Sequence, residues 1–342
     1  MRATSQTVVK MIAANRPLLV WGTPGVGKTA GVSAAAEEAG YRVMVLVGNC
    51  RAPEDFAGLP YIEGGVARYA GQGWAVDANK HDGPVLVILD ELTTATPAVM
   101  AAMLRVIQER HVGDVALADH VRIVALANPP TLGGHLRPLP AALANRFVHL
   151  DFEVDVDRWE RWMTATHRGD ALGPILGFLR ARRDLLAPAP PMDATTAGGA
   201  WPSPRSWDAA CAICSTVGSG WAGMVAAAVG ASAGAEFAAW MDAADLPDTR
   251  TVMADPGKVG WSRMRPDQVF AVLCSVAIAG SSGDQADRDA AYRVLEVVGD
   301  HAPDLGVAAL SALITSDPAA AVPFGRLGAY GAFLDTLSHL RR

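Results

Sequence analysis

The stretch Gly22-Thr23-Pro24-Gly25-Val26-Gly27-Lys28-Thr29 decides the fold, because it matches the pattern G-x-x-x-x-G-K-[ST]. It follows a short apolar run, Leu18 to Trp21, and precedes an Ala- and Val-rich segment typical of a helix, 29–39. That context separates a phosphate-binding loop from a chance Gly-rich turn. Glycines let several backbone N–H groups face one phosphate, and the helix N-terminus adds a favourable dipole. The pattern predicts that Lys28 reaches the β- and γ-phosphates of a nucleotide and that the Thr29 hydroxyl holds Mg²⁺.

A second chemical signal is Val85-Leu86-Val87-Ile88-Leu89-Asp90-Glu91, an apolar run that ends in two acids. On a central strand, this pattern places Asp90 at the carboxyl edge of the sheet, where open α/β sheets bind ligands. We expect Asp90 to hold Mg²⁺ through water and Glu91 to orient and polarise an attacking water. The alternative is an acidic strand end solvated at the surface, which the upstream glycine loop disfavours.

Three more polar residues are candidates for functional roles. Asn128 directly follows the predicted apolar strand 121–127. At the end of that strand, its side-chain amide could hold the attacking water or touch the γ-phosphate. Judged without the other motifs, an asparagine at this position would more often be a turn residue. Arg146 lies between a predicted helix and the last predicted strand, and a surface arginine is an equally good local reading. Arg205 begins a predicted helix outside the sheet, between prolines and tryptophans that favour a rigid turn.

The order of elements predicts an α/β fold. Continuous apolar runs with helices between them indicate a parallel sheet that is covered on both faces. After the run 18–21, the further apolar runs are 43–47, 85–89, 121–127 and 147–150. Thr96-Pro97 predicts a helix start, with its end near Arg110. The segments 59–70 and 111–124 predict two hairpins, one before and one after the Val85 strand. From about residue 153 only helices are predicted, with a turn-rich break over 245–260 and helices over 266–340.

The length and composition of the chain limit the classes of protein to which it can belong. The chain has 342 residues, of which 51% are hydrophobic and 19% charged. This length predicts two domains, and the hydrophobic fraction predicts a sizeable core and excludes general disorder. The longest uncharged stretch, 209–235, is rich in Ala, Gly and Ser and lacks the apolar run of about 20 residues that a membrane span needs. No basic-then-apolar leader opens the chain, which favours a cytoplasmic protein.

Charge and cysteine content exclude further classes. Residues 1–150 carry 13 Lys and Arg against 12 Asp and Glu, and residues 151–342 carry 16 against 23. Without a basic stripe, the chain is a poor candidate for binding a phosphate backbone, so no nucleic-acid partner is expected. Four cysteines in this length form no disulfide framework. Cys211 and Cys214 form a lone C-x-x-C, which favours plain helix packing over a metal site.

Taken together, these motifs resemble those of the AAA+ ATPases, and within them the MoxR family, over roughly residues 5–245. GTPGVGKT resembles the Walker A motif, VLVILDE the Walker B motif with its catalytic Glu91, and ALAN the sensor 1 strand ending in Asn128. ANRF resembles the segment that carries an arginine finger, here Arg146, although Asn145 stands where many relatives have Asp. SPRSW resembles the start of the sensor 2 helix, here with Arg205. The two hairpins resemble the helix 2 insert and the pre-sensor 1 insert.

The resemblance implies a nucleotide-binding α/β domain (1–152), a helical lid with sensor 2 (153–245) and a C-terminal helical extension (246–342). It implies hydrolysis of ATP, with Mg²⁺, between the subunits of a homo-oligomeric ring, expected to be a hexamer. MgATP would be bound by the eight loop residues 22–29 together with Asp90 and Arg205. Within this set, the metal ligands would be Thr29 and Asp90. The catalytic residues would be Glu91, Asn128 and Arg146. Relatives are chaperone-like remodellers, often with a von Willebrand factor A domain partner. A nucleic-acid motor and a slow nucleotide-binding scaffold are the alternative functions.

Overall fold

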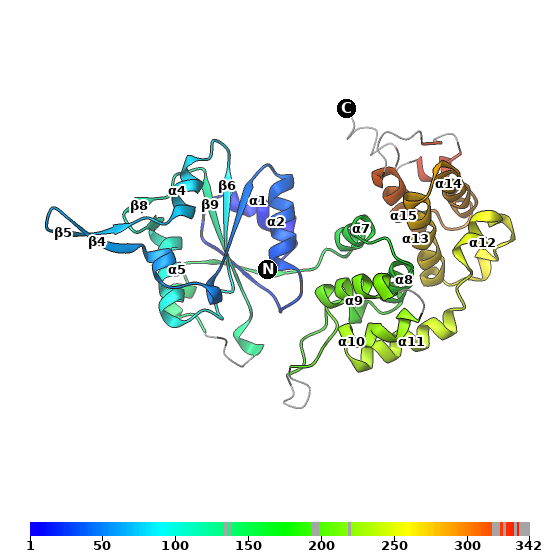
Figure 1. The fold of residues 1–342 in the computed structure, drawn as a ribbon, viewed down its shortest axis with the longest axis horizontal. Helices are drawn as coiled ribbons and strands as arrows, with labels where there is room; N and C mark the ends of the chain where they lie inside the picture. Colours follow the sequence, from blue (N-terminus) through cyan, green and yellow to red (C-terminus); the bar gives the residue numbers. More distant parts are fainter. Residues whose placement is uncertain are drawn as a thin grey trace. The chain divides into compact units, whose positions relative to one another are not determined.

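One sheet of six parallel strands organises the N-terminal part of the described chain (Figure 1). In spatial order the strands are β1 (Arg2–Ala3), β10 (Val148–Phe152), β2 (Leu18–Trp21), β9 (Val121–Ala127), β6 (Val85–Asp90) and β3 (Arg42–Val47). Each neighbouring pair is parallel. The predicted α/β fold with a parallel sheet is therefore confirmed. Because the strands are parallel, β2, β6 and β9 present their carboxyl ends at one edge of the sheet.

The computed structural model describes residues 1–132, 136, 138–192, 198–217, 220–316, 322–323, 326–331 and 334. Its contacts divide the chain into two compact units. The first is built on Met1–Asp155 and holds the sheet, and the second is built on Val156–Pro191 together with the later part of the chain.

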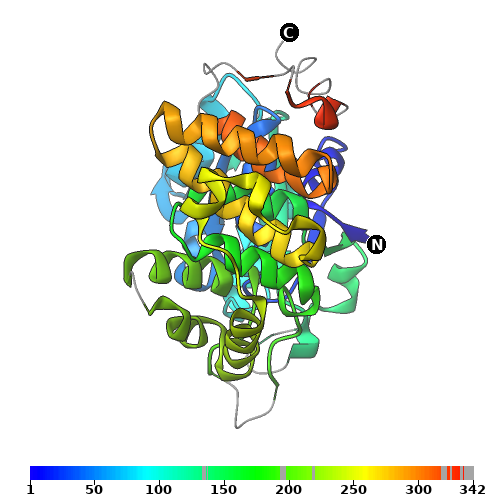
Figure 2. The same ribbon diagram turned by 90° about the vertical axis from the view of Figure 1, so that its right-hand side faces the viewer.

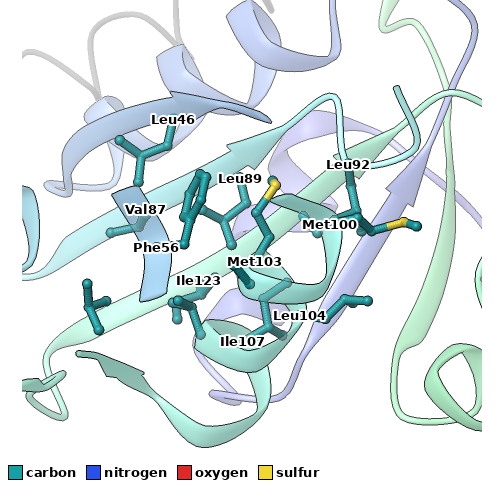
Figure 3. Packing of buried hydrophobic residues seen from close by; sticks show 14 of the residues in the cluster. Leu46, Phe56, Val87, Leu89, Leu92, Met100, Met103, Leu104, Ile107 and Ile123 are labelled. Carbon is teal, nitrogen blue, oxygen red and sulfur yellow. The ribbon is translucent and has the colours of Figure 1, made fainter. Parts of the chain in front are cut away.

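Both faces of the sheet are buried, as the continuous apolar strands predict. Along β6, Val87 and Leu89 belong to one buried cluster and Leu86 and Ile88 to another, as the alternation of side chains in a strand requires. The first cluster packs β6 and β9 against α5 (Pro97–Glu109), whose methionines and aliphatic side chains point at the strands (Figure 3). The second packs the other face against α1 (Ser5–Ile12) and α2 (Lys28–Glu38).

Local signals explain why α5 begins where the sequence predicts. The Thr96 side chain accepts a hydrogen bond from the Val99 amide, and Pro97 occupies the first turn, where its missing N–H costs nothing. The helix ends at Glu109, and Arg110 follows in the left-handed region. This helix fixes the strand-to-helix loop after β6, which carries the acidic residues.

Both predicted hairpins are present. They consist of β4 (Leu59–Glu63) with β5 (Val66–Ala70), and of β7 (His111–Val112) with β8 (Val115–Ala116). Every residue of β4 and β5 is exposed, and this hairpin projects from its unit in Figure 1. In the first unit, the strand β1 and the α-helices α1, α3 (Glu54–Ala57) and α4 (Gly73–Lys80) were not predicted.

Helices are the regular elements of the second unit among its described residues, and loops join them (green to orange in Figure 2). Its α-helices are α7 (Val156–Thr166), α8 (Leu172–Ala181), α9 (Pro204–Val217), α10 (Val225–Val229), α11 (Ala231–Ala244), α12 (Thr249–Ala254), α13 (Pro266–Ser282), α14 (Gln285–Gly299) and α15 (Pro303–Ser316). The predicted turn-rich break at 245–260 was partly wrong, because α12 forms within it: Asp248 caps its first turn by accepting from the Thr251 amide. Within the stretch 266–340, where helices are predicted, residues 317–321, 324–325, 332–333 and 335–340 lie outside the described residues.

The lid and the C-terminal extension expected from the sequence pack on each other. Helix α8 approaches α13 closely at two glycines: a Cβ on Gly173 would lie 2.5 Å from the Ala271 carbonyl oxygen, and one on Gly177 would lie 2.8 Å from that of Asp267. The Trp240 indole of α11 also donates to Asp267 (2.7 Å). The three-domain division at 152/153 and 245/246 stays a prediction.

Cys211 and Cys214 are buried, free thiols on α9, in agreement with the prediction that they pack within a helix. Burial raises the pKa of the Cys211 thiol to about 12, so the group stays protonated at neutral pH. Among the described helices, none combines the length and the apolar character that crossing a bilayer demands.

Candidate nucleotide-binding site

The glycine loop joins β2 to α2, the strand-to-helix context that the sequence predicts. Gly25 and Gly27 have φ of 78° and 88°, a region that a side chain would strain. Gly27 directly precedes Lys28, the first residue of α2, so the loop delivers the chain into the helix N-terminus. A Cβ on Gly22 would lie 2.9 Å from Lys28 Cδ. Glycine at position 22 therefore leaves room for the lysine to fold back over the loop.

Lys28 is the cation of the site. Its side chain is buried (8% exposed), and Nζ donates to the carbonyl oxygens of Gly22 (2.6 Å) and Thr23 (3.1 Å) and to Asn128 Oδ1 (2.9 Å). The bond to Asn128 links the loop after β2 to the end of β9, the neighbouring strand. The sequence-predicted Lys28 and Asn128 are thus in direct contact.

Thr29 and Asp90 form the second contact across the carboxyl edge. Thr29 Oγ1 donates to Asp90 Oδ2 at 2.5 Å. A hydroxyl and a carboxylate oxygen are hard donors of the kind Mg²⁺ takes when phosphates and waters supply its other ligands. The donor set therefore fits a magnesium ion bound together with a nucleotide, held by the two residues that the sequence predicts.

Glu91 follows Asp90 in an unusual backbone conformation, with φ of 56°. Its amide donates to Asp90 Oδ1 (2.8 Å), which ties the two acids together. Its carboxylate Oε2 accepts from Asn49 Nδ2 and from Thr94 Oγ1 (3.2 Å). Side chains from two neighbouring strand ends therefore fix the direction of the Glu91 carboxylate.

Asn49 and Thr93 belong to the site, and the sequence analysis missed both. Asn49 lies just after β3, whose last residue, Val47, pairs with Asp90, so the strand order could have pointed to it. Thr93 is fully buried; its hydroxyl donates to the Asn128 carbonyl oxygen (2.9 Å) and accepts from the Asn128 amide (3.2 Å). One hydroxyl thus holds the backbone of Asn128 against the loop that carries Glu91.

The structure does not bring Arg146 to this edge. Arg146 precedes β10, and Val148, the first residue of β10, pairs with Leu18, the first residue of β2. Arg146 therefore lies at the amino edge of the sheet, whereas the glycine loop follows the carboxyl end of β2. Its side chain is exposed, and Nη1 donates to Gln108 Oε1 on α5 (2.7 Å).

Arg205 is the second residue of α9 and is exposed on the helical unit. The turn before it is ordered by Ser203 and Ser206, whose side chains bond each other and each other's amides. The rigid turn expected around this arginine is present, and its action on a nucleotide stays a prediction.

Comparison with known proteins agrees with the geometry of the first unit. Residues 17–147 match the model of the AAA domain, dynein-related subfamily. Midasin of Giardia intestinalis is 25% identical over 213 residues, which are 57% of this chain and 4% of that protein. This chain thus spans only a small fraction of the length of that curated relative.

Solved structures were compared as well. A point mutant of RuvB from Thermotoga maritima aligns with 83% of this chain and 80% of its own, at 16% identity and a TM-score of 0.37. PCH-2 of C. elegans aligns with 53% of this chain and 45% of its own, at 19% identity and a TM-score of 0.28.

Proposed function

We propose that the chain hydrolyses ATP to ADP and phosphate at the carboxyl edge of its sheet. The observation that carries the proposal is the convergence there of a lysine, a hydroxyl, two carboxylates and an amide from three adjacent strand ends: Lys28, Thr29, Asp90, Glu91 and Asn128. The match of residues 17–147 to an AAA domain supports the same activity.

The residues divide the work between phosphate binding and water activation. The loop amides of residues 22–29 and the Lys28 ammonium bind the phosphates, while Thr29 and Asp90 would hold Mg²⁺, which would supply positive charge to stabilise the phosphates. Glu91 accepts a proton from the attacking water. Asn49 and Thr94 hold Oε2 of that carboxylate, so Oε1 is the oxygen offered to the water.

Asn128 positions the water or the γ-phosphate through its side-chain amide. Its Oδ1 accepts from Lys28, so the Nδ2 group is the one that can donate to a phosphate or water oxygen. Thr93 fixes its backbone on both sides. These contacts support the proposed role of Asn128, because they hold its side chain and its backbone.

We infer the finer assignment from the motif resemblance. The chain would be a MoxR-type AAA+ ATPase, assembled as a homo-hexameric ring in the cytoplasm and coupling hydrolysis to chaperone-like remodelling of a partner that carries a von Willebrand factor A domain. Arg146 would act on the nucleotide of the neighbouring subunit, and no nucleic-acid partner is expected. Co-purification with the products of neighbouring genes tests the choice of partner.

Lys28→Ala should lose ATP binding. A hydrogen bond to a charged group contributes about 1.5–3 kcal/mol, so the affinity should fall about 10- to 100-fold or more. Titration calorimetry with ATP measures the loss, and Lys10→Ala, an exposed lysine on α1, is the matched control. An unchanged ATP affinity in Lys28→Ala would mean that Lys28 does not bind the phosphates.

Arg205→Ala should weaken discrimination between ATP and ADP. A guanidinium that meets the γ-phosphate stabilises ATP alone, so the ratio of ATP to ADP affinity should fall by about 10-fold or more, as the loss of one charge-assisted bond predicts. Arg263→Ala, an exposed arginine in the same unit, is the control. A wild-type affinity ratio would reassign Arg205 to packing between Trp201 and Trp207.

A further inference from the structure

A relay of two aromatic side chains connects the end of β2 to the turn that carries Arg146. Trp21 Nε1 donates to His149 Nδ1 at 2.8 Å, and the two rings are nearly coplanar, with centroids 6.0 Å apart and planes 14° apart. His149 Nε2 bonds the Ala144 carbonyl oxygen at 2.7 Å. Trp21 directly precedes the glycine loop, and Ala144 is the last residue of α6 (Ala141–Ala144), two positions before Arg146.

The chemistry of the relay fixes the state of His149. An indole nitrogen can only donate, so Nδ1 of His149 is the acceptor and the imidazole proton resides on Nε2. That N–H then donates to Ala144. The same carbonyl oxygen accepts the Phe147 amide (3.2 Å), and the Phe147 ring meets the imidazole edge-on. His149 therefore holds the C-terminal carbonyl of α6 and the turn that follows it.

We propose that His149, kept in one tautomer by Trp21, is a positioning residue that aims Arg146 at the neighbouring subunit's nucleotide. The inference rests on the proposed action of Arg146 in trans. Arg146 is exposed and lies in a short turn that follows a four-residue helix. The restraints on this turn include the Gln108 contact, the His149 bond to Ala144, and the backbone bonds from the Asn145 amide to Ala141 and from the Phe147 amide to Ala144. A displacement of about 1 Å in a catalytic group costs about 10²-fold in rate, so loosening the turn should slow hydrolysis.

Two variants remove the relay and leave its ring packing. His149→Phe keeps a ring beside Trp21 and Phe147 but has no nitrogen, and Trp21→Phe removes the N–H that sets the tautomer. His149→Gln places an amide N–H near the position of Nε2, so it should restore part of the lost activity. His111→Gln, on an exposed histidine of β7, and Trp162→Phe, on an exposed tryptophan of α7, are the matched controls.

Mixed assemblies show on which side of the interface the relay acts. Glu91→Gln subunits cannot hydrolyse but can donate Arg146, and Arg146→Ala subunits can hydrolyse but cannot donate. We expect His149→Phe to hydrolyse ATP about 10²-fold more slowly than wild type at unchanged ATP affinity. It should recover activity when mixed with Glu91→Gln and should not recover when mixed with Arg146→Ala. Differently tagged subunits establish that the mixed assemblies form.

Every other outcome overturns the inference. Recovery only with Arg146→Ala would mean that the relay acts through β2 on its own glycine loop. If His149→Phe recovers with both variants or with neither, the relay does not act by positioning Arg146 for the neighbouring subunit. Wild-type activity of His149→Phe alone would lead to the same conclusion. If Glu91→Gln and Arg146→Ala do not complement each other, the trans role of Arg146 fails and this inference with it, while Lys28→Ala and Glu91→Gln still test hydrolysis separately.

Discussion

Glu91→Gln should bind ATP with wild-type affinity and fail to hydrolyse it. The amide has the size of the carboxylate and still accepts a hydrogen bond, but it cannot take a proton from water. Positioned acid–base groups contribute about 10²–10⁴-fold, so turnover should fall within that range. Because Lys28, Thr29 and Asp90 are untouched, the nucleotide should stay bound.

Binding and turnover are measured separately for this variant, by ATP titration and by steady-state phosphate release. Glu109→Gln is the matched control, since Glu109 is an exposed carboxylate on α5 that pairs with Arg105 (2.7 Å) away from the loop. Equal losses of ATP affinity in Glu91→Gln and Lys28→Ala would contradict the division of the site into phosphate-binding and water-activating residues.

Arg146→Ala should also bind ATP but hydrolyse it slowly. A guanidinium that meets the transferring phosphoryl group stabilises charge that develops in the transition state, and such arginines contribute about 10³–10⁵-fold in other P-loop proteins. The amino-edge position of Arg146 favours action on a neighbouring subunit. Wild-type specific activity should therefore rise with protein concentration as assemblies form.

Phosphate release across a range of protein concentrations checks this expectation, with sedimentation to follow assembly. Arg105→Ala, an exposed arginine on α5, is the control. A wild-type rate in Arg146→Ala, or a specific activity of the wild type that does not change as assemblies form, would leave Arg146 as a surface residue.

The sequence predicts the sheet and the chemistry at its carboxyl edge because both depend on local patterns. A buried parallel strand is a continuous apolar run, and its carboxyl end stands at the ligand-binding edge. This places Asp90, Asn128 and the glycine loop that leads to Lys28 at that edge without knowledge of the strand order. The helix start at Thr96-Pro97 is similarly local.

Features that depend on register or on distant pairing could not be predicted. Strand β1 has two residues, and only its pairing with β10 makes it a strand. Asn49 meets Glu91 because β3 lies beside β6, and His149 meets Trp21 because β10 lies beside β2. Each of these residues is an ordinary polar or aromatic residue in its own stretch, and only the spatial order of the strands gives it a partner.

The central claim is that this carboxyl edge hydrolyses ATP. Its most direct test is multiple-turnover phosphate release by the wild-type chain, supplied with MgATP at a protein concentration where it assembles. We expect many phosphates to be released per chain, with release abolished by omitting Mg²⁺ and reduced to near background in Glu91→Gln. A chain that binds ATP yet releases no more than one phosphate per subunit, or releases it at the same rate in Glu91→Gln, would contradict the account.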